Sequence, residues 1–220
     1  MAYDVKYYFE YQQVDTRIAV GAVWSALPND YRPALTTTKA GTTVTSVIRT
    51  AANPTSPWYL PIQQFATASI ATGRTWTTAD TFDIAMCGYE DNAALNASMY
   101  MVIRILDSTL ATERSGSPIY SGNFNTSEVS AVAYSQRHAD GVAITSGCTQ
   151  QSNDRIIVEI GYVCACSTNG YSPRMWFGTN SANDLSLEDN NTVTPANFNP
   201  WLAFTYGAPA AASNVVLNII

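Results

Sequence analysis

The stretch that most constrains the fold is Asp154–Tyr162, in which apolar and polar side chains alternate. In an extended chain one side carries four apolar residues, Ile156, Val158, Ile160 and Tyr162. The other side carries Arg155, Ile157 and Glu159. This period of two, rich in β-branched residues, is typical of a strand and unfavourable for a helix. The polar side predicts a sheet with one solvated face, which is common in antiparallel sheets.

Similar stretches recur along the chain with turn residues between them. They predict further strands at residues 3–11, 17–24, 82–86, 99–106, 174–178 and 201–206, of which 99–106 is apolar enough to be buried on both faces. Residues 36–50, rich in Thr and Val around Ala40-Gly41, predict a hairpin. Pro28 and Pro33 predict a break in strand structure between them.

The spacing of these stretches, with no helical pattern longer than about two turns, predicts an all-β chain. The architecture expected is an antiparallel two-sheet β-sandwich, jelly-roll-like, with extended terminal segments. Its 220 residues are enough for one such domain. We therefore expect an N-terminal strand or docking segment at 1–35, the sandwich at 36–206, and a linker with an apolar tail at 207–220.

The composition excludes several classes of partner. Charged residues make up 13% of the chain and the formal net charge is -6, so a direct nucleic-acid partner, which needs clustered Lys and Arg, is not expected. No run approaches the roughly 18 apolar residues of a membrane span. The N-terminal sequence lacks the charged-then-apolar order of a secretory signal, so we expect that the protein is not exported by that route, or that a mature form is given.

Candidate catalytic residues are few, and the expectation is that the protein is not an enzyme. His138 is the single histidine, and no Gly-x-Ser-x-Gly turn marks a serine for it to activate. Without an export signal the cysteines are expected to be reduced, and they lack the Cys-x-x-Cys pair of a zinc site: Cys87, Cys148, Cys164 and Cys166. Paired carboxylates for glycoside hydrolysis stay open, because their separation is spatial.

Two polar segments carry oxygen ligands of the kind that Ca²⁺ prefers. The first offers Asp184, Glu188 and Asp189, and the second is Glu90-Asp91-Asn92. Neither has the spacing of a calcium loop, so ordinary polar loops explain both, and no cofactor is expected.

Aromatic residues offer a second kind of binding surface. Several of them on one open face would stack sugar rings, whereas core packing is the alternative for the same set: Trp24, Trp58, Tyr59, Trp76, Tyr171 and Trp176.

The chain ends are the predicted partner-binding segments. Apolar side chains follow the Ala-rich linker, namely Val215, Val216, Leu217, Ile219 and Ile220, and an aromatic set lies near the start, namely Tyr7, Phe9 and Tyr11. Such residues are costly to leave in water. Each set either pairs with the chain's own sheet or adds a strand to a neighbouring subunit, and we favour the neighbour for the tail.

A series of landmarks gives the chain a family resemblance. They are Gly73-Arg74-Thr75-Trp76, Phe82–Met86, Asn92–Ala97, Met101–Arg104, Asp154–Gly161, Phe177–Asn180 with Asp184-Leu185, and Trp201–Phe204. In this order they resemble jelly-roll virion structural proteins of tailed bacteriophages, over about residues 70 to 206. The resemblance implies a capsid decoration, fibre or tail-associated subunit and carries no catalytic residue across.

The resemblance and the chain ends together predict a structural component of a phage virion, assembled in the host cytoplasm and acting through protein-protein contacts. The partners expected are further copies of the chain, with a trimer as one arrangement, and the major capsid protein or other virion proteins. The alternative is a carbohydrate-binding module that attaches to glycans, and a third class is a glycan-cleaving enzyme.

Overall fold

The computed structural model describes residues 3–16, 18–24, 31–43, 45–48, 50, 56–166 and 170–207. Their regular structure is strand, apart from two single-turn 3-10 helices, η1 (Ala93–Leu95) and η2 (Pro195–Asn197). The prediction of an all-β chain is confirmed. The strands are β1 (Val5–Thr16), β2 (Tyr31–Thr36), β3 (Thr45–Ile48), β4 (Trp58–Thr67), β5 (Arg74–Trp76), β6 (Thr81–Tyr89), β7 (Ala97–Leu106), β8 (Tyr120–Asn125), β9 (Ser135–Ala143), β10 (Cys148–Gln150), β11 (Arg155–Cys164), β12 (Arg174–Phe177), β13 (Asn183–Asp184), β14 (Phe198–Asn199) and β15 (Trp201–Thr205).

Most of these strands belong to one hydrogen-bonded sheet. Its order is β3-β12-β6-β15-β1-β2-β4-β11-β7-β8, with β9 on β6, and β5 with β10 and β13 with β14 form two small sheets. Pairing is antiparallel except between β2 and β4 and between β13 and β14. Because hydrogen bonds run through the large sheet without a break, its division into the two sheets of a jelly roll stays a prediction.

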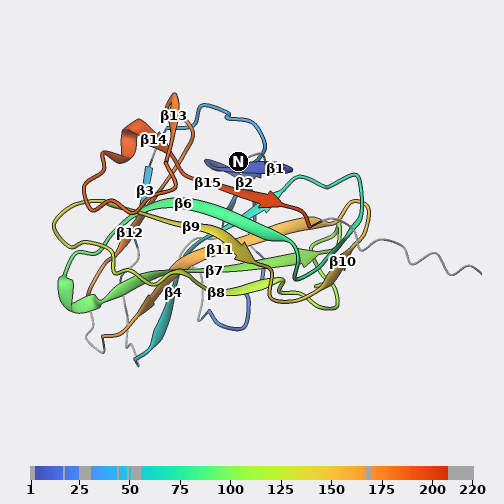
Figure 1. The fold of residues 1–220 in the computed structure, drawn as a ribbon, viewed down its shortest axis with the longest axis horizontal. Helices are drawn as coiled ribbons and strands as arrows, with labels where there is room; N and C mark the ends of the chain where they lie inside the picture. The colour runs from blue at the N-terminus through green and yellow to red at the C-terminus, as the bar shows by residue number, and fades with distance from the viewer. Residues whose placement is uncertain are drawn as a thin grey trace, which may run out of the picture.

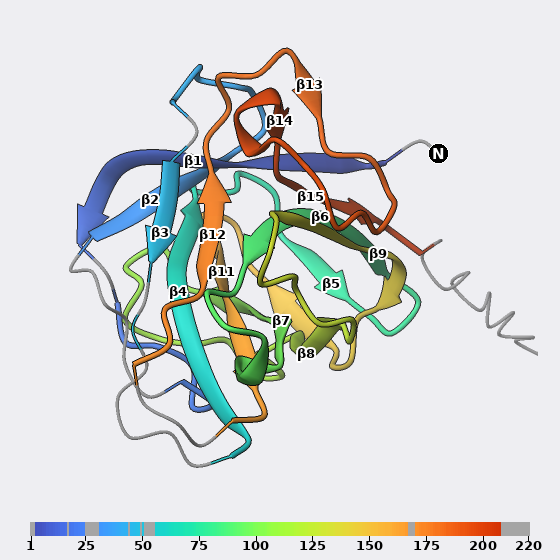
Figure 2. The same cartoon turned by 90° about the vertical axis from the view of Figure 1, so that its left-hand side faces the viewer.

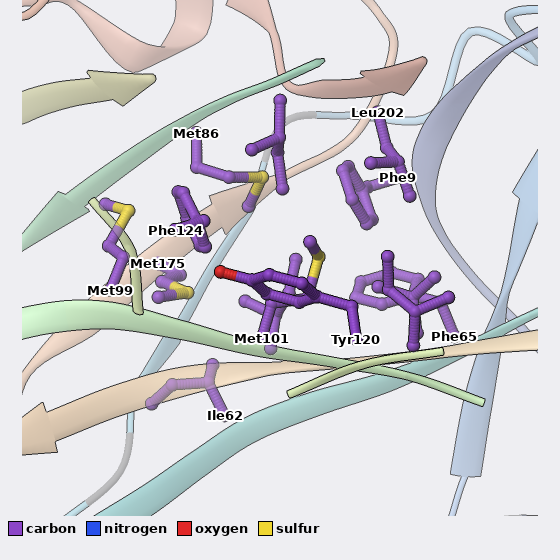
Figure 3. Close-up of a cluster of buried hydrophobic side chains, with 14 of the residues drawn as sticks. Phe9, Ile62, Phe65, Met86, Met99, Met101, Tyr120, Phe124, Met175 and Leu202 are labelled. Carbon is purple, nitrogen blue, oxygen red and sulfur yellow. The ribbon is translucent and has the colours of Figure 1, made fainter. Parts of the chain in front are cut away.

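The large sheet bends so that its two halves face one another across the core. Figure 1 shows β6, β9 and β15 on one side and β4, β7, β8 and β11 on the other. Aromatic rings from strands that share no hydrogen bonds meet between them: the rings of Phe9 and Phe65 are 5.0 Å apart, and those of Phe82 and Tyr120 are 4.7 Å apart. Figure 3 shows Met86, Leu202, Met101 and Ile62 in the same core.

Strand β11 confirms one half of its predicted pattern and corrects the other. Ile156, Val158, Ile160 and Tyr162 lie in the core. The opposite face is not solvated as predicted, because Ile157 and Glu159 are both fully buried. Residues 18–24, predicted as part of a strand, are irregular chain packed over this face. The prediction for 99–106 is confirmed, because every residue in that range is buried.

The first strand is an integral part of the sheet. β1 lies between β15 and β2, with Val5 opposite Phe204 and Phe9 opposite Leu35. Figure 2 shows that β1 begins and β15 ends on the same side of the molecule. The predicted docking range 1–35 therefore contributes strands to the same sheet as 36–206.

The predicted hairpin at 36–50 is wrong. Its flanking strands pair with other partners, β2 with β1 and β4, and β3 with β12. The break predicted between Pro28 and Pro33 lies outside the described residues as far as residue 30, and it is wrong from Tyr31 to Pro33, which belong to β2. Pro33 pairs with β1 at a point where the register of β1 shifts, so a proline without an N–H is accommodated in an irregular ladder.

Candidate functional site

The main candidate site is a cleft at the junction of β2 and β4, the one parallel pair in the large sheet among the described strands. Between β2 and β4 the recorded partners are Ala34 with Ala66 and Leu35 with Thr67. Residues of these two strands and of the segments that follow them line a cavity of about 480 Å³, which we call the seam cleft. It is lined by Tyr7, residues 32–38, residues 66–70 and Arg155.

The wall of the seam cleft combines apolar surface with hydroxyl and guanidinium groups. Leu35 and Ala66 are buried, Ile70 is half-buried and Ala68 is exposed at the rim. Arg32 is buried within the wall, and the Nε atom of half-buried Arg155 is enclosed with no hydrogen-bond partner among the described residues. The cleft therefore suits an apolar ligand that also carries a hydrogen-bond acceptor.

A smaller cavity of about 200 Å³ adjoins the seam cleft and shares Tyr7 and Ile70 with it. Its wall includes Tyr206, whose ring stacks on the Arg74 guanidinium with 3.4 Å between the ring centroid and the guanidinium carbon. Arg74 in turn forms an ion pair with Asp80 at 2.9 Å. Burial, helped by the neighbouring Tyr206, raises the pKa of Tyr7 to about 12, so this phenol stays protonated at neutral pH.

The predicted residues His138 and Asp189 come together, but as a structural pair. His138 Nδ1 lies 2.9 Å from Asp189 Oδ1, and the same oxygen accepts the His138 backbone N–H. Burial would raise the pKa of Asp189, but hydrogen bonds from Asn125 and His138 outweigh it and lower that pKa. Among the described residues no hydrogen bond joins a serine hydroxyl or a cysteine thiol to the imidazole.

The predicted calcium ligands are held by the chain's own groups. Asp184 forms ion pairs with Lys6 at 2.8 Å and Lys39 at 2.7 Å. Burial would raise the pKa of Asp184, but these lysines and Asn199 lower it to about 2. Glu188 accepts the Ser186 hydroxyl. Within the described ranges no three His, Cys, Asp or Glu side chains gather in a way that could hold a metal ion.

The four cysteines do not gather either. Cys87, Cys148, Cys164 and Cys166 are buried as free thiols. Burial, only partly offset by Arg137, raises the pKa of Cys87 to about 12. Cys87 is therefore not an activated nucleophile.

The predicted aromatic residues do not form one open platform. Trp24 and Tyr59 both pack on the ring of Tyr100, on the outer face of the sheet. Trp76 lies in the core against Phe204, and Trp176 packs on Tyr134 at 4.1 Å.

A carboxyl pair that the sequence did not reveal lies elsewhere. Glu90 is buried, accepts the Ala97 N–H at 3.0 Å, and its carboxyl is hydrogen-bonded to that of Glu128. Burial and Glu128 together raise the pKa of Glu90 to about 8, against the lowering effect of the Ala97 N–H. Neither residue lines the seam cleft.

The predicted partner-binding residues divide between the core and the undescribed range. Tyr7 and Phe9 are buried in this chain's own core, and Tyr11 is packed against it. Val215, Val216, Leu217, Ile219 and Ile220 lie outside the described residues. Sequence reasoning missed the seam cleft, because its walls are assembled by a parallel pairing that leaves no local signal.

Comparisons with known proteins give no family. No family model and no curated protein matches the chain. Among solved structures, an alpha-amino acid ester hydrolase is similar with 9% identity and a TM-score of 0.38, over 90% of this chain and 35% of that one. A CocE/NonD family hydrolase from Staphylococcus aureus is similar with 9% identity and a TM-score of 0.28, over 92% of this chain and 34% of that one. The chain thus spans about a third of the length of either hydrolase.

None of the described helices has the length and hydropathy needed to span a bilayer.

Proposed function

We propose that the protein is a non-enzymatic structural subunit that holds a neighbouring protein by docking an extended apolar segment of it in the seam cleft. The observation that carries this proposal is the lining of the cleft, which is apolar at Leu35, Ala66 and Ile70 and open at its rim beside Ala68. A bound extended segment commonly places alternate side chains in pockets of its partner.

The chemistry of the cleft wall favours binding over catalysis. None of the described residues that line it carries a carboxylate, an imidazole or a thiol. Tyr7 is the one lining residue with a phenol, and its pKa of about 12 keeps it protonated. The wall thus supplies no general base near neutral pH.

We propose that the protein acts in the particle of a tailed bacteriophage, where it is a capsid decoration, fibre or tail-associated subunit. This part of the proposal rests on the sequence resemblance over about residues 70 to 206. In such a particle the partners are the major capsid protein, other virion proteins and further copies of this chain, and repeated weak contacts add avidity. A weakly charged surface suits a subunit surrounded by neighbours.

A cleft-filling substitution tests the docking role. Ala68→Trp places a large ring at the exposed rim of the cleft, and Val132→Trp adds the same ring at a side chain that is 93% exposed and outside the cleft. We expect Ala68→Trp to reduce the amount of subunit that co-sediments with phage particles at least tenfold, with Val132→Trp like wild type. Equal co-sedimentation of all three proteins would refute the docking role.

The same proteins distinguish the other classes of function. Binding of wild-type protein to a glycan array, unchanged in Ala68→Trp, would favour the carbohydrate-binding alternative. Release of sugars from a bound glycan would favour the glycan-cleaving enzyme. Either result, together with no particle association, would overturn the structural role.

A further inference from the structure

We infer that the segment docked in the seam cleft carries an aspartate or glutamate side chain, whose carboxylate forms an ion pair with Arg155. The inference rests on the proposed function, because it takes the cleft as a groove for an extended segment of a neighbouring protein. It adds the chemistry by which the cleft selects that segment.

Arg155 lies at the rim of the cleft beside Ala68. In the antiparallel register between β11 and β4, Ile157 is opposite Ala66, and the same register continued by two residues places Arg155 opposite Ala68. Side chains at opposite positions of an antiparallel pair share one face. Both residues line the seam cleft, so the guanidinium is within reach of a ligand at its rim.

The guanidinium of Arg155 has no anionic partner in the described part of this chain. Its Nε atom is enclosed without a hydrogen-bond partner, and the guanidinium forms no ion pair with a described residue. Three other arginines each pair with a carboxylate, namely Arg74 with Asp80, Arg104 with Glu159 and Arg114 with Asp154. An enclosed donor without an acceptor is costly, so a ligand that supplies one is bound favourably.

The carboxylates nearest to Arg155 in sequence are already occupied. Asp154 accepts two hydrogen bonds from Arg114, at 2.8 and 2.6 Å. Glu159, which alternation places on the same face as Arg155, is paired with Arg104 at 3.0 Å. Since none of the described residues that line the cleft is acidic, the acceptor for Arg155 comes from the ligand.

The charge of the cleft favours a carboxylate over a neutral carbonyl. The chain has a formal net charge of -6, yet both charged residues that line the seam cleft, Arg32 and Arg155, are cationic. A cavity lined by one sign of charge attracts the opposite sign. A guanidinium also presents paired N–H groups that match the two oxygens of a carboxylate, whereas a carbonyl offers one oxygen and no charge.

The rim of the cleft favours an extended segment as the carrier of that carboxylate. The recorded pairs of β2 and β4 end at Leu35 and Thr67, beyond which Ala68 and Ser69 are exposed in the cleft wall. The N–H groups of Ala68 and Ser69 form no hydrogen bond with a described residue. An extended chain offers carbonyls to such groups and points alternate side chains toward the wall. We therefore expect apolar side chains against the apolar wall and one acidic side chain at Arg155.

A peptide library tests this chemistry on the purified full chain. The probe is a synthetic library of random hexapeptides, acetylated at the N-terminus and amidated at the C-terminus, so that only side chains carry carboxylates. Peptides retained by the wild type are expected to be enriched about tenfold in Asp or Glu over Asn or Gln at one position among apolar residues.

Three substitutions assign this enrichment to the guanidinium. Arg155→Gln should abolish it, and Arg155→Lys, which keeps the charge without the paired N–H groups, should retain part of it. The intermediate result with lysine separates loss of the ion pair from loss of the fold. Arg174→Gln is the control and should match the wild type, because the Arg174 guanidinium lies outside the cleft, 5.4 Å from the centroid of the Tyr89 ring.

Failure of this inference differs from failure of the proposed function. Loss of the retained peptides in Ala68→Trp, without acidic enrichment in the wild type, would leave the docking role standing and overturn the inference. Acidic enrichment that depends on Arg155, with unchanged particle association of Ala68→Trp, would support the inference and overturn the proposed function. Retention of the same acidic peptides by Arg155→Gln, or of no peptide by the wild type, would also overturn the inference.

Discussion

Glu159 and Arg104 form an ion pair with 3.0 Å between Oε1 and Nη1, on the face of β11 that residues 18–24 cover. Glu159 is fully buried and also accepts hydrogen bonds from the Gly21 N–H and the Gln64 amide. Arg104 also donates to the Ala19 carbonyl. The pair therefore fixes an irregular segment over a sheet face that would otherwise be open.

Loss of this pair should destabilise the whole chain. Glu159→Gln leaves Arg104 with the partly exposed Glu113 as its ion-pair partner, and breaking a buried pair costs about 3–5 kcal/mol of unfolding free energy. Urea unfolding measures this loss. The control is Glu188→Gln, an exposed site expected to change stability by less than about 0.5 kcal/mol. Equal midpoints for the two variants would contradict the role of the pair.

Substitution of Phe9 tests whether the buried side chains of β1 stabilise this chain's own core or bind a partner. Its side chain is fully buried against Phe65 and Phe177, so Phe9→Ala should lower the unfolding free energy of the isolated chain by about 3–5 kcal/mol. Val132→Ala at an exposed position should have little effect. If Phe9→Ala reduced particle association but left the unfolding free energy of the isolated chain unchanged, the Phe9 side chain would belong to an interface with a partner.

The raised pKa of Glu90 predicts that the unfolding free energy of the chain decreases as the pH rises. The pKa of Glu90 is raised from its ordinary 4.5 to about 8 by burial and Glu128, so between these values the folded chain holds a proton that the unfolded chain releases. The stability due to this group is fully present below pH 4.5 and is lost through pH 8. Chemical unfolding at pH 5 and pH 8 should show a smaller decrease in Glu90→Gln than in wild type. Parallel pH profiles would refute the assignment.

The lowered pKa of Asp184 predicts that the unfolding free energy decreases as the pH falls in the acidic range. Burial opposes ionisation, but Lys39, Lys6 and Asn199 lower the pKa of Asp184 from 3.8 to about 2. Its contribution is therefore present above pH 3.8 and is lost as the pH falls through about 2. Asp184→Asn should be less stable than wild type at pH 6 and should match it more closely at pH 2, as measured by thermal unfolding. A constant difference across this range would count against the ion pairs.

The strands could be predicted from sequence where the pattern is local, but the cleft could not. Alternation in β11 identified Ile156 and Ile160 as core residues. It could not show that Glu159 is buried, because the Gly21 N–H that binds it comes from a segment 138 positions earlier in the chain. The prediction of a hairpin around Gly41 was wrong for a similar reason. The backbone groups of β2 and β3 form their hydrogen bonds with other strands, β1 and β12, and not with each other.

The seam cleft depends on the same long-range pairing. Ala34 and Ala66 meet because β2 pairs with β4, and parallel strands such as these require a long connection that no turn motif reveals. The Glu90 and Glu128 carboxyls likewise meet through the tertiary fold, so the sequence position of Glu90 does not indicate its raised pKa.

The pairing of Val5 with Phe204 sets a condition on biosynthesis. One edge of β1 has no partner until β15 has been synthesised, so the nascent protein carries an unpaired β1 edge while the residues between the two strands are made. Non-local closure of this kind is slow, and the sheet can be completed only after β15 has left the ribosome.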